Sequence, residues 1–468
     1  MFPDAETAPF FDFYPSIPIL ATAVRLRNPG AKTLNYRPLM RKQSKIELMS
    51  PAGDATSLAA ALRAGADSVY FGVGTLNMRA AASANFEEKD IPAIARKCRA
   101  AGAKCYLALN TVVFDDELES ARRLCAVAAE SGVDAVIAGD PAAFMAAREA
   151  SLPVHVSVQA NIANIEALRF HAEFADAVVL ARELDLRRIR RIAEAVRAEN
   201  ILGPSGEPVR IELFVHGALC VSVSGLCHMS LATENASGNR GECRQTCRRR
   251  YRVVDEETGR ELVIDNHHVM SPKDLCCVGM LDEIAASGVS ILKIEGRGRS
   301  ADYVDTVTRV YREALDACLD GTFSTEKALE WERRLELTFN RGFWKGGHYL
   351  GRPAEAWAAA SGNRSLKTKT HIGKITNYFA KIGVAEITLN AGGLAENDEF
   401  IVVGPTTGAL NARAERILLD GEPVRNARKG DVVSVKIPRK ARRNDKVYRL
   451  DDRTPAEDAA QRKENDNE

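Results

Sequence analysis

The sequence has little of several features that would place a protein in a simple class. Aromatic residues make up only 6% of its 468 residues, and the net charge is only +1. No window approaches the roughly 20 apolar residues that a membrane-spanning helix needs. The run Ile17–Val24 contains Pro18 and follows several acids, which is the wrong flank for a secretory signal. Any affinity for nucleic acid must therefore come from local charge rather than from the global field.

Two common hydrolase motifs are also missing. The chain has no His-Glu-x-x-His zinc helix and no Gly-x-Ser-x-Gly nucleophile elbow. Cys220 and His216 are close enough in sequence to suggest a nucleophile and base, but Cys220 belongs to a group of cysteines spaced like metal ligands. A peptidase built on this chain would lack an obvious catalytic apparatus.

The regular part of the chain begins at about residue 45 and alternates short apolar runs with helical patterns. This rhythm is typical of βα units around a parallel sheet, and the 46% hydrophobic content is enough for a sizeable core. Eight such runs predict a (β/α)8 barrel, with a doubly wound open sheet as the alternative. The runs are Ile46–Met49, Ser68–Phe71, Lys104–Leu109, Ala135–Ala138, Val154–Val158, Ala177–Leu180, Ile211–Val215 and Ile291–Ile294.

The remaining segments differ in composition from the barrel. Residues 1–44 lack periodicity and predict a disordered leader, either a true extension or the result of a start site placed upstream of Met40. The barrel domain is expected over 45–350. A linker over 351–370, a small all-β barrel over 371–450 with turns every 8–12 residues, and a disordered tail over 451–468 should follow.

Polar and charged residues follow nearly every predicted strand. In a barrel these positions meet at one face, where the loops after the strands form the active site. Asn110 and Gln159 are polar positions of this kind. The charged and titratable candidates for a shared site are Arg79, Arg182, Glu183, His216, Lys293, Glu295 and Arg297. Each has a structural explanation of its own, such as a strand cap or an ion pair, but together they favour one cavity.

About 75 residues separate the seventh and eighth predicted strands, which is far more than a βα connection needs. Four of the ten cysteines fall in this insertion, which we place at 216–277: Cys220, Cys227, Cys243 and Cys247. Their clustering favours a metal site in a cytoplasmic protein over a disulfide framework. The spacing fits an iron–sulfur cluster better than zinc, while buried or redox-active thiols are a third interpretation.

Two segments of the chain are strongly basic. One lies in the insertion and the other in the predicted β domain, where Asp431 is the single acid among eight cations. A solvated surface explains each run on its own, but two such segments are also what an RNA backbone would require. The insertion contributes Arg240, Arg244, Arg248, Arg249, Arg250 and Arg252; the β domain contributes Arg425, Arg428, Lys429, Lys436, Arg439, Lys440, Arg442 and Arg443.

Several motifs together resemble the collagenase-like peptidase family of unassigned catalytic type, over roughly residues 45–350. They are Ser50-Pro-Ala-Gly, Ala-Gly-Ala-Asp67-Ser-Val-Tyr-Phe-Gly72, Leu76-Asn-Met-Arg79, His216-Gly-Ala-Leu-Cys220, Ser224-Gly-Leu-Cys227, Asn239-Arg-Gly-Glu-Cys243, Ser271-Pro-Lys-Asp-Leu275 and Leu292-Lys-Ile-Glu-Gly-Arg297. This chain departs from the pattern at His228, after the second cysteine, and at Cys276-Cys277, after the Lys-Asp-Leu motif.

The resemblance implies an activity different from the family's title. Although its members are classed as peptidases, several act as oxygen-independent hydroxylases with a [4Fe–4S] cluster. One branch hydroxylates carbon 5 of the tRNA wobble uridine with prephenate as the required metabolite, another modifies ribosomal RNA, and short members act on ubiquinone. The chain looks most like the tRNA branch, and the family's cluster ligands correspond to its four clustered cysteines.

These considerations lead to one working hypothesis with two alternatives. We expect the barrel mouth to hold a small anionic metabolite beneath the insertion, while the basic segments bind a tRNA loop with one base turned into the cavity. Carboxylate clamps are expected from Arg79, Arg182, Lys293 and Arg297, and Glu183 and Glu295 are candidates for proton transfer or for orienting the arginines. A peptidase and a cluster-dependent modifier of a quinone or other small aromatic molecule are the alternatives.

Overall fold

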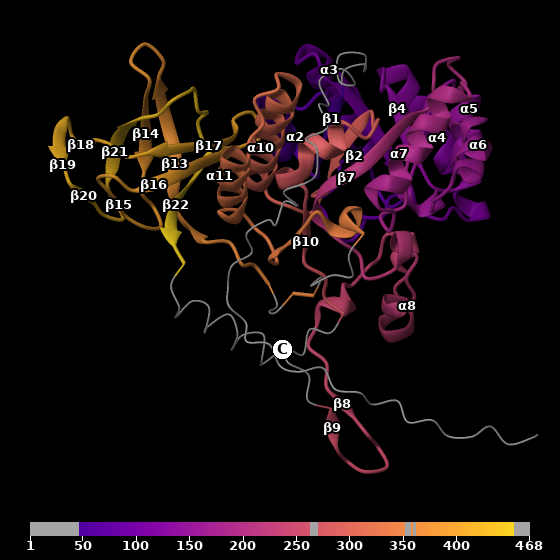
Figure 1. Ribbon diagram of the computed structural model, residues 1–468. Helices are drawn as coiled ribbons and strands as arrows, with labels where there is room; N and C mark the ends of the chain where they lie inside the picture. The colour runs from indigo at the N-terminus through magenta and orange to yellow at the C-terminus, as the bar shows by residue number, and fades with distance from the viewer. Residues whose placement is uncertain (1–45, 263–269, 352–356, 359–361, 454–468) are drawn as a thin grey trace, which may run out of the picture.

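The structure is a computed structural model that describes residues 46–262, 270–351, 357–358 and 362–453. The predicted leader and most of the predicted tail lie outside these ranges. Two domains are visible in Figure 1, a helix-covered barrel and a C-terminal domain made only of strands.

Eight parallel strands form a closed barrel at the centre of the larger domain. Each strand pairs with the next, and the last, β11, pairs with both β1 and β7, which closes the ring. The predicted (β/α)8 barrel is therefore confirmed, and the open sheet is excluded. The strands are β1 (Glu47–Ala52), β2 (Ser68–Gly72), β3 (Lys104–Leu109), β4 (Ala135–Ala138), β5 (Val154–Val156), β6 (Ala177–Val179), β7 (Arg210–Ala218) and β11 (Ile291–Ile294).

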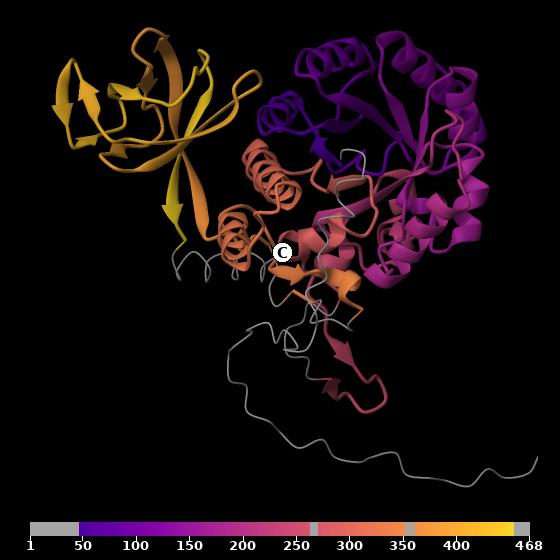
Figure 2. The same cartoon turned by 45° about the horizontal axis from the view of Figure 1, so that its top comes forward.

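Helices surround these strands and bury one apolar face each (Figure 2). In α3, for example, Ile91, Ile94, Ala95 and Cys98 recur at helical spacing and are all buried, while the opposite face carries charges. No helix in the described part of the chain is long and apolar enough to cross a membrane. The helices of the barrel are α2 (Ala55–Arg63), α3 (Ile91–Ala100), α4 (Leu118–Ser131), α5 (Pro141–Glu149), α6 (Ile165–Ala172), α7 (Leu186–Ala198) and α10 (Ala301–Leu319).

The insertion between β7 and β11 leaves the barrel at the carboxyl end of β7. Its strand β10 pairs antiparallel with the end of β7, and β12 (Phe343–Lys345), from beyond the barrel, pairs in parallel with β10. The β8–β9 hairpin projects away from the barrel in Figure 1. The elements of the insertion are α8 (Met229–Glu234), β8 (Val253–Val254), β9 (Glu261–Leu262) and β10 (Asp274–Cys276), and the short helix α9 (Leu281–Ala285) follows it before β11.

The C-terminal domain is an antiparallel sheet wrapped around its own apolar core. The first strand begins at Lys367, inside the segment predicted as a linker, because residues 367–371 pair with 448–452 of the last strand. That last strand in turn runs two residues into the predicted tail. The main strands are β13 (Lys367–Phe379), β14 (Val384–Thr388), β16 (Glu399–Gly404), β17 (Gly408–Arg413), β18 (Ile417–Leu419), β19 (Glu422–Val424), β21 (Val432–Lys436) and β22 (Lys446–Asp452).

The two domains are packed directly against each other. Gly408 of β17 approaches α2 so closely that a Cβ there would lie 2.8 Å from the backbone nitrogen of Ala60. Arg63 at the end of α2 donates through Nη2 to the carbonyl oxygen of Thr406 at 3.0 Å. These contacts fix the C-terminal domain beside α2 and α10, which is followed in the chain by α11 (Thr325–Glu336).

Candidate active site

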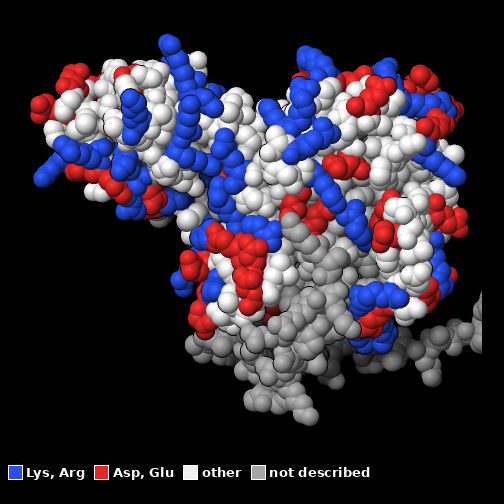
Figure 3. Space-filling model, turned by 90° about the horizontal axis from the view of Figure 1, so that it is seen from above, with Lys and Arg blue, Asp and Glu red and all other residues white. Residues whose placement is uncertain are grey.

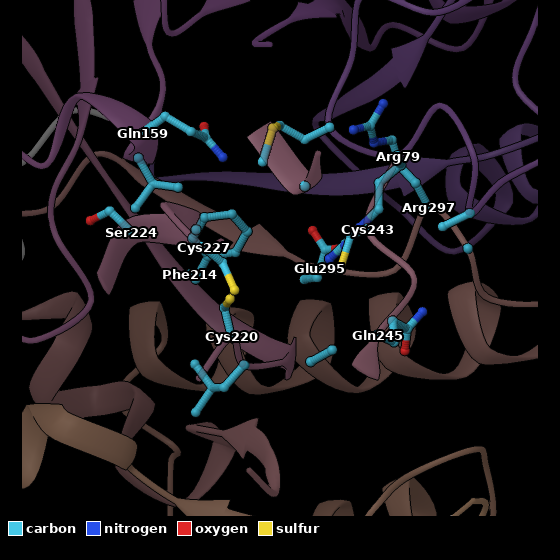
Figure 4. Close-up of a pocket in the computed structure, with 18 of the residues that line it drawn as sticks. Arg79, Gln159, Phe214, Cys220, Ser224, Cys227, Cys243, Gln245, Glu295 and Arg297 are labelled. Atoms are coloured by element: carbon cyan, nitrogen blue, oxygen red, sulfur yellow. The ribbon is translucent and has the colours of Figure 1, made fainter. Parts of the chain in front are cut away.

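A cavity of about 190 Å³ lies at the carboxyl ends of the barrel strands, beneath the insertion. Its lining combines residues from the barrel, such as Tyr70 of β2 and Phe214 of β7, with all four clustered cysteines. Figure 4 labels Phe214 and three of these cysteines, Cys220, Cys227 and Cys243. The cavity is thus at the position where (β/α)8 barrels carry their active sites. The insertion forms its outer wall.

The four cysteines approach the cavity from separate, irregular segments. Cys220 is exposed and follows β7, whereas Cys227, Cys243 and Cys247 are half-buried in turns of the insertion. Burial raises the pKa of the Cys247 thiol, and the three other thiols add to that rise, so the four sulfurs influence one another electrostatically. All four are free of disulfides.

The arrangement of these thiols does not match a closed site for a single ion. Among the residues that the structure describes, no three His, Cys, Asp or Glu side chains are grouped so as to hold one metal ion. A tetrahedral zinc site requires all its sulfurs about 2.3 Å from one atom. An iron–sulfur cluster instead takes one thiolate per iron. The four thiols that line the cavity fit a cluster in their donor set, although not in a preformed geometry.

The cavity is strongly cationic. Among the described residues, its lining includes seven cationic side chains and one carboxylate, that of Glu295. The cations are Arg79, Arg182, Arg248, Lys293, Arg297, Arg299 and Arg341.

Glu295 is held by an arginine and a tyrosine. Arg79 donates to its Oε1 through Nε at 3.0 Å and Nη2 at 2.9 Å, and the Tyr70 hydroxyl donates to its Oε2 at 3.1 Å. Burial alone would raise the pKa of Glu295, but the guanidinium groups of Arg79, Arg297 and Arg182 lower it to about 2. Glu295 is therefore a carboxylate that orients Arg79 and offsets its charge.

Lys293 is likewise engaged by a carboxylate. Its Nζ donates to Oε1 of Glu212 at 2.7 Å, and Nδ1 of His155 lies 3.4 Å from Oε2 of the same carboxylate. Burial would raise the pKa of Glu212, but Lys293 and His155 lower it to about 2. The Lys293 ammonium also lies 4.6 Å from the centre of the Tyr70 ring, at the floor of the cavity. The positive charge of Lys293 is thus balanced by the Glu212 carboxylate.

Arg182 and Arg297 are the predicted clamps that each keep an unpartnered buried Nε. The Nε of each is buried and has no hydrogen-bond partner within the described residues. Arg297 is only 4% exposed, and its Nη1 donates to Oδ1 of Asn77 at 2.8 Å. A Cβ at Gly72 would lie 2.3 Å from that Nη1, so glycine is required for this approach. Arg182 lies over the Phe214 ring at 4.2 Å.

Two predicted site residues do not line the cavity. Glu183 is exposed, and the charge it presents acts on His348. His216 packs against the rings of Tyr303, Tyr311 and Phe343. The pairing of β7 with β11 shifts register between Phe214 and His216, and this irregularity breaks the alternation that would place both side chains on one face.

The burial of His216 predicts a specific pH dependence of stability. Burial, with a contribution from Arg299, lowers its pKa from 6.5 to about 3. Between these values the unfolded chain binds a proton that the folded chain does not, so the free energy of unfolding falls with decreasing pH by about 1.4 kcal/mol per unit. Urea unfolding between pH 6 and 4 should give a wild-type slope that exceeds the slope of His216→Phe by about this amount. Equal slopes would contradict the assignment.

Sequence reasoning gave no site role to three of the cavity's cations. Arg341 comes from beyond the barrel, and with Arg299 it faces Asp274 of β10, at 3.5 and 3.9 Å. Arg248 was assigned only to a basic surface, yet its Nη2 donates to the carbonyl oxygen of Leu219 at 2.6 Å. It therefore fixes the chain next to Cys220.

Arg240 also belongs to the internal framework of the insertion. It pairs with Glu117 at 2.5 Å and lies 3.9 Å over the Phe114 ring, both from the loop after β3. The neighbouring backbone nitrogen of Val112 donates to the carbonyl oxygen of Asn239 at 3.1 Å. Gly241 has φ +82° and lies so near Asn77 that a Cβ would come within 2.3 Å of its carbonyl oxygen. These contacts position the segment that leads to Cys243.

Comparison with known proteins identifies the family. The profile of peptidase family U32 matches residues 53–359, which is more than half of the chain. The chain belongs to peptidase family U32. A collagenase of Porphyromonas gingivalis is 46% identical to this U32 protein over 87% of this chain and 98% of its own length. The family resemblance expected from the motifs is thus confirmed.

Other relatives of this U32 protein have names that refer to RNA. The 23S rRNA 5-hydroxycytidine C2501 synthase of Escherichia coli is 37% identical over 64% of this chain and 44% of its own length. The tRNA hydroxylation protein P1 of Bacillus subtilis is 33% identical over 64% of this chain and 69% of its own length. The U32 family thus includes both peptidase-named and RNA-modifying relatives of this chain.

Proposed function

We propose that this U32 protein is a cytoplasmic, oxygen-independent RNA hydroxylase that acts on carbon 5 of the tRNA wobble uridine. In this proposal prephenate is the oxygen-donating metabolite, and Cys220, Cys227, Cys243 and Cys247 hold a [4Fe–4S] cluster. The names of the RNA-modifying relatives support the hydroxylase class. Prephenate and the wobble uridine are taken from what the family resemblance implies.

The observation that carries the proposal is the composition of the cavity. It combines four thiols and seven cations with one carboxylate that is already neutralised, and its described lining has neither a histidine nor an aspartate. An acid or base for peptide hydrolysis is therefore not evident there, because the carboxylate of Glu295 has a pKa near 2. The charges of the cavity are instead suited to an anionic metabolite bound beside thiolate ligands.

Each part of the cavity has a distinct role in this proposal. When bound, the cluster would supply one-electron chemistry at the outer wall. Arg182 and Arg297 bind the carboxylates of the metabolite through their free donors, and Phe214 and Tyr70 give its ring an apolar face. Glu295 and Glu212 keep Arg79 and Lys293 in place, while the insertion excludes water.

The basic segments contribute unequally to an RNA surface. In the insertion, Arg240 and Arg248 are used internally. Arg244, Arg249, Arg250 and Arg252 are exposed, but Arg249 and Arg252 are paired with Glu234 and Glu261. In the C-terminal domain every cation of the predicted basic segment except Arg439 is exposed. Figure 3 shows Lys and Arg side chains over that domain and along its junction with the barrel. We infer that the C-terminal domain supplies most of the phosphate contacts.

The direct test is the nucleoside content of tRNA. Mass spectrometry of tRNA from a strain that lacks this chain should show loss of 5-hydroxyuridine and of modifications built on it. Expression of the wild-type chain should restore them. Unchanged 5-oxyuridine derivatives in the deletion strain would contradict the tRNA assignment, and loss of hydroxycytidine from 23S rRNA would move the proposal to ribosomal RNA.

A peptidase is the second candidate. It is favoured by the match to the collagenase of Porphyromonas gingivalis, which covers 98% of the length of that collagenase. Incubation of the purified chain with gelatin and soluble collagen separates the two functions. Cleavage that disappears in a variant of a cavity residue but not in a surface variant would support the peptidase. No cleavage is expected from the hydroxylase.

A further inference from the structure

A chain of polar side chains on one cavity wall has a fixed hydrogen-bond polarity. Asn110 follows β3, and Ser157 and Gln159 follow β5, with Gln159 in a short 3₁₀ turn over 158–160. The backbone nitrogen of Met78 donates to Oδ1 of Asn110 at 3.2 Å. Nδ2 of Asn110 lies 3.3 Å from Oε1 of Gln159, and the Ser157 hydroxyl donates to the same oxygen.

The backbone nitrogen at one end of this chain determines the orientation of every amide in it. A peptide N–H can only donate, so the atom of Asn110 that faces Met78 must be its oxygen. The other atom, Nδ2, can only donate, so the atom of Gln159 that it meets must be an oxygen as well. Nε2 of Gln159 is therefore the atom that is left over. The identity of the donors and acceptors therefore fixes the orientation of the Gln159 amide.

Nε2 of Gln159 is presented to the cavity. Gln159 is part of the lining, and Figure 4 shows its amide nitrogen on the side of the cavity's interior. No acceptor for Nε2 is found among the described residues. Arg182 and Phe214 line the same cavity. The wall thus carries one neutral, oriented donor beside cationic donors.

We propose that Gln159 is a specificity-determining residue that donates through Nε2 to a carbonyl oxygen of the bound substrate. This inference rests on the proposed function, which places a pyrimidine base and a carboxylate metabolite in the cavity. Both carry carbonyl oxygens. A uracil ring has one at C4, where cytosine carries an amino group that would place donor against donor. A buried donor left without an acceptor is costly, so such a contact discriminates between substrates.

Two variants at different positions test this role. Gln159→Leu removes the donor. Asn110→Asp leaves Gln159 in place but puts an oxygen where Nδ2 was, so that Gln159 must turn its Nε2 towards residue 110 and its oxygen towards the cavity. Asn200→Asp adds the same charge in the loop between α7 and β7, at the opposite end of the barrel, and controls for the net charge of the chain. Because Asn110→Asp also places a negative charge in the cavity lining, the neutral variant Gln159→Leu decides whether the lost donor weakens binding.

The measurement is equilibrium binding to the full chain purified without oxygen. The probes are an anticodon stem-loop RNA with uridine at the wobble position and, separately, prephenate. Gln159→Leu and Asn110→Asp should each weaken one of them by about tenfold, while Asn200→Asp should not. A loss confined to the RNA assigns the carbonyl to the base. A loss confined to prephenate assigns it to the metabolite.

The remaining outcomes separate this inference from the proposed function. If the wild type binds both probes and neither variant changes either affinity, Gln159 has no such role and the hydroxylase proposal stands. If the wild type binds neither the RNA nor prephenate, the proposed function is wrong and this inference falls with it. Circular dichroism of each variant establishes that a loss of binding is not a loss of fold.

Discussion

Cys243→Ala should yield a colourless protein that no longer hydroxylates RNA. Cys243 is brought into the cavity by contacts of the preceding segment with the loops after β2 and β3, and it acts electrostatically on Arg79. Loss of one of four thiolates leaves an iron of the proposed cluster without its protein ligand. Activity should fall by at least about two orders of magnitude, because the redox group is lost and not merely displaced.

Visible absorption and iron analysis after purification without oxygen measure this effect. Cys318→Ala is the control, because Cys318 is a buried cysteine of α10 that lies outside the cavity lining. That variant should keep the colour and the iron of the wild type. Full iron content in Cys243→Ala, with the same absorption as the wild type, would remove Cys243 from the proposed ligand set.

Arg297→Met should weaken prephenate binding by roughly 30- to 1,000-fold, which corresponds to about 2–4 kcal/mol. Arg297 is buried, is oriented by Asn77 and keeps an unpartnered Nε. Its positive charge and its fork of donors are therefore available to a carboxylate. Methionine keeps much of the apolar length but provides neither.

Isothermal titration with prephenate measures the loss. Arg297→Lys should recover part of the affinity, since it restores the charge but not the bidentate geometry. Arg197→Met, in the last turn of α7 on the exposed surface, is the control and should bind as the wild type does. Equal affinity of the wild type and Arg297→Met would show that Arg297 is not a clamp for this metabolite.

The positions of the barrel strands were predictable because each strand is buried on both faces. Such strands form short, almost continuous apolar runs, and all eight runs correspond to strands. Their boundaries shifted by a few residues because hydrogen bonding, and not hydrophobicity, ends a strand. The carboxyl-end residues followed from the same logic, which brought Arg79, Arg182, Lys293, Glu295 and Arg297 into one cavity.

The ion pairs that these charged side chains form were not predictable from the sequence. Arg79 and Glu295 are 216 residues apart, and Lys293 and Glu212 are 81 apart, so their pairing depends on closure of the barrel. From their positions at the carboxyl ends of the strands, Arg79 and Lys293 were expected to be free to clamp a substrate. The structure instead gives each of them a carboxylate partner. His216 was misplaced for a different reason: the irregular pairing of β7 with β11 breaks the alternation on which the argument relied.

In the proposed function, Cys220, Cys227, Cys243 and Cys247 hold one inorganic centre at the mouth of the barrel. Quantification of iron and acid-labile sulfide, together with Mössbauer spectra of the ⁵⁷Fe-labelled chain purified without oxygen, tests it most directly. We expect about four iron and four sulfide per chain and the spectrum of a [4Fe–4S] cluster. A chain that contains stoichiometric zinc, or neither iron nor sulfide after anaerobic reconstitution, would contradict it.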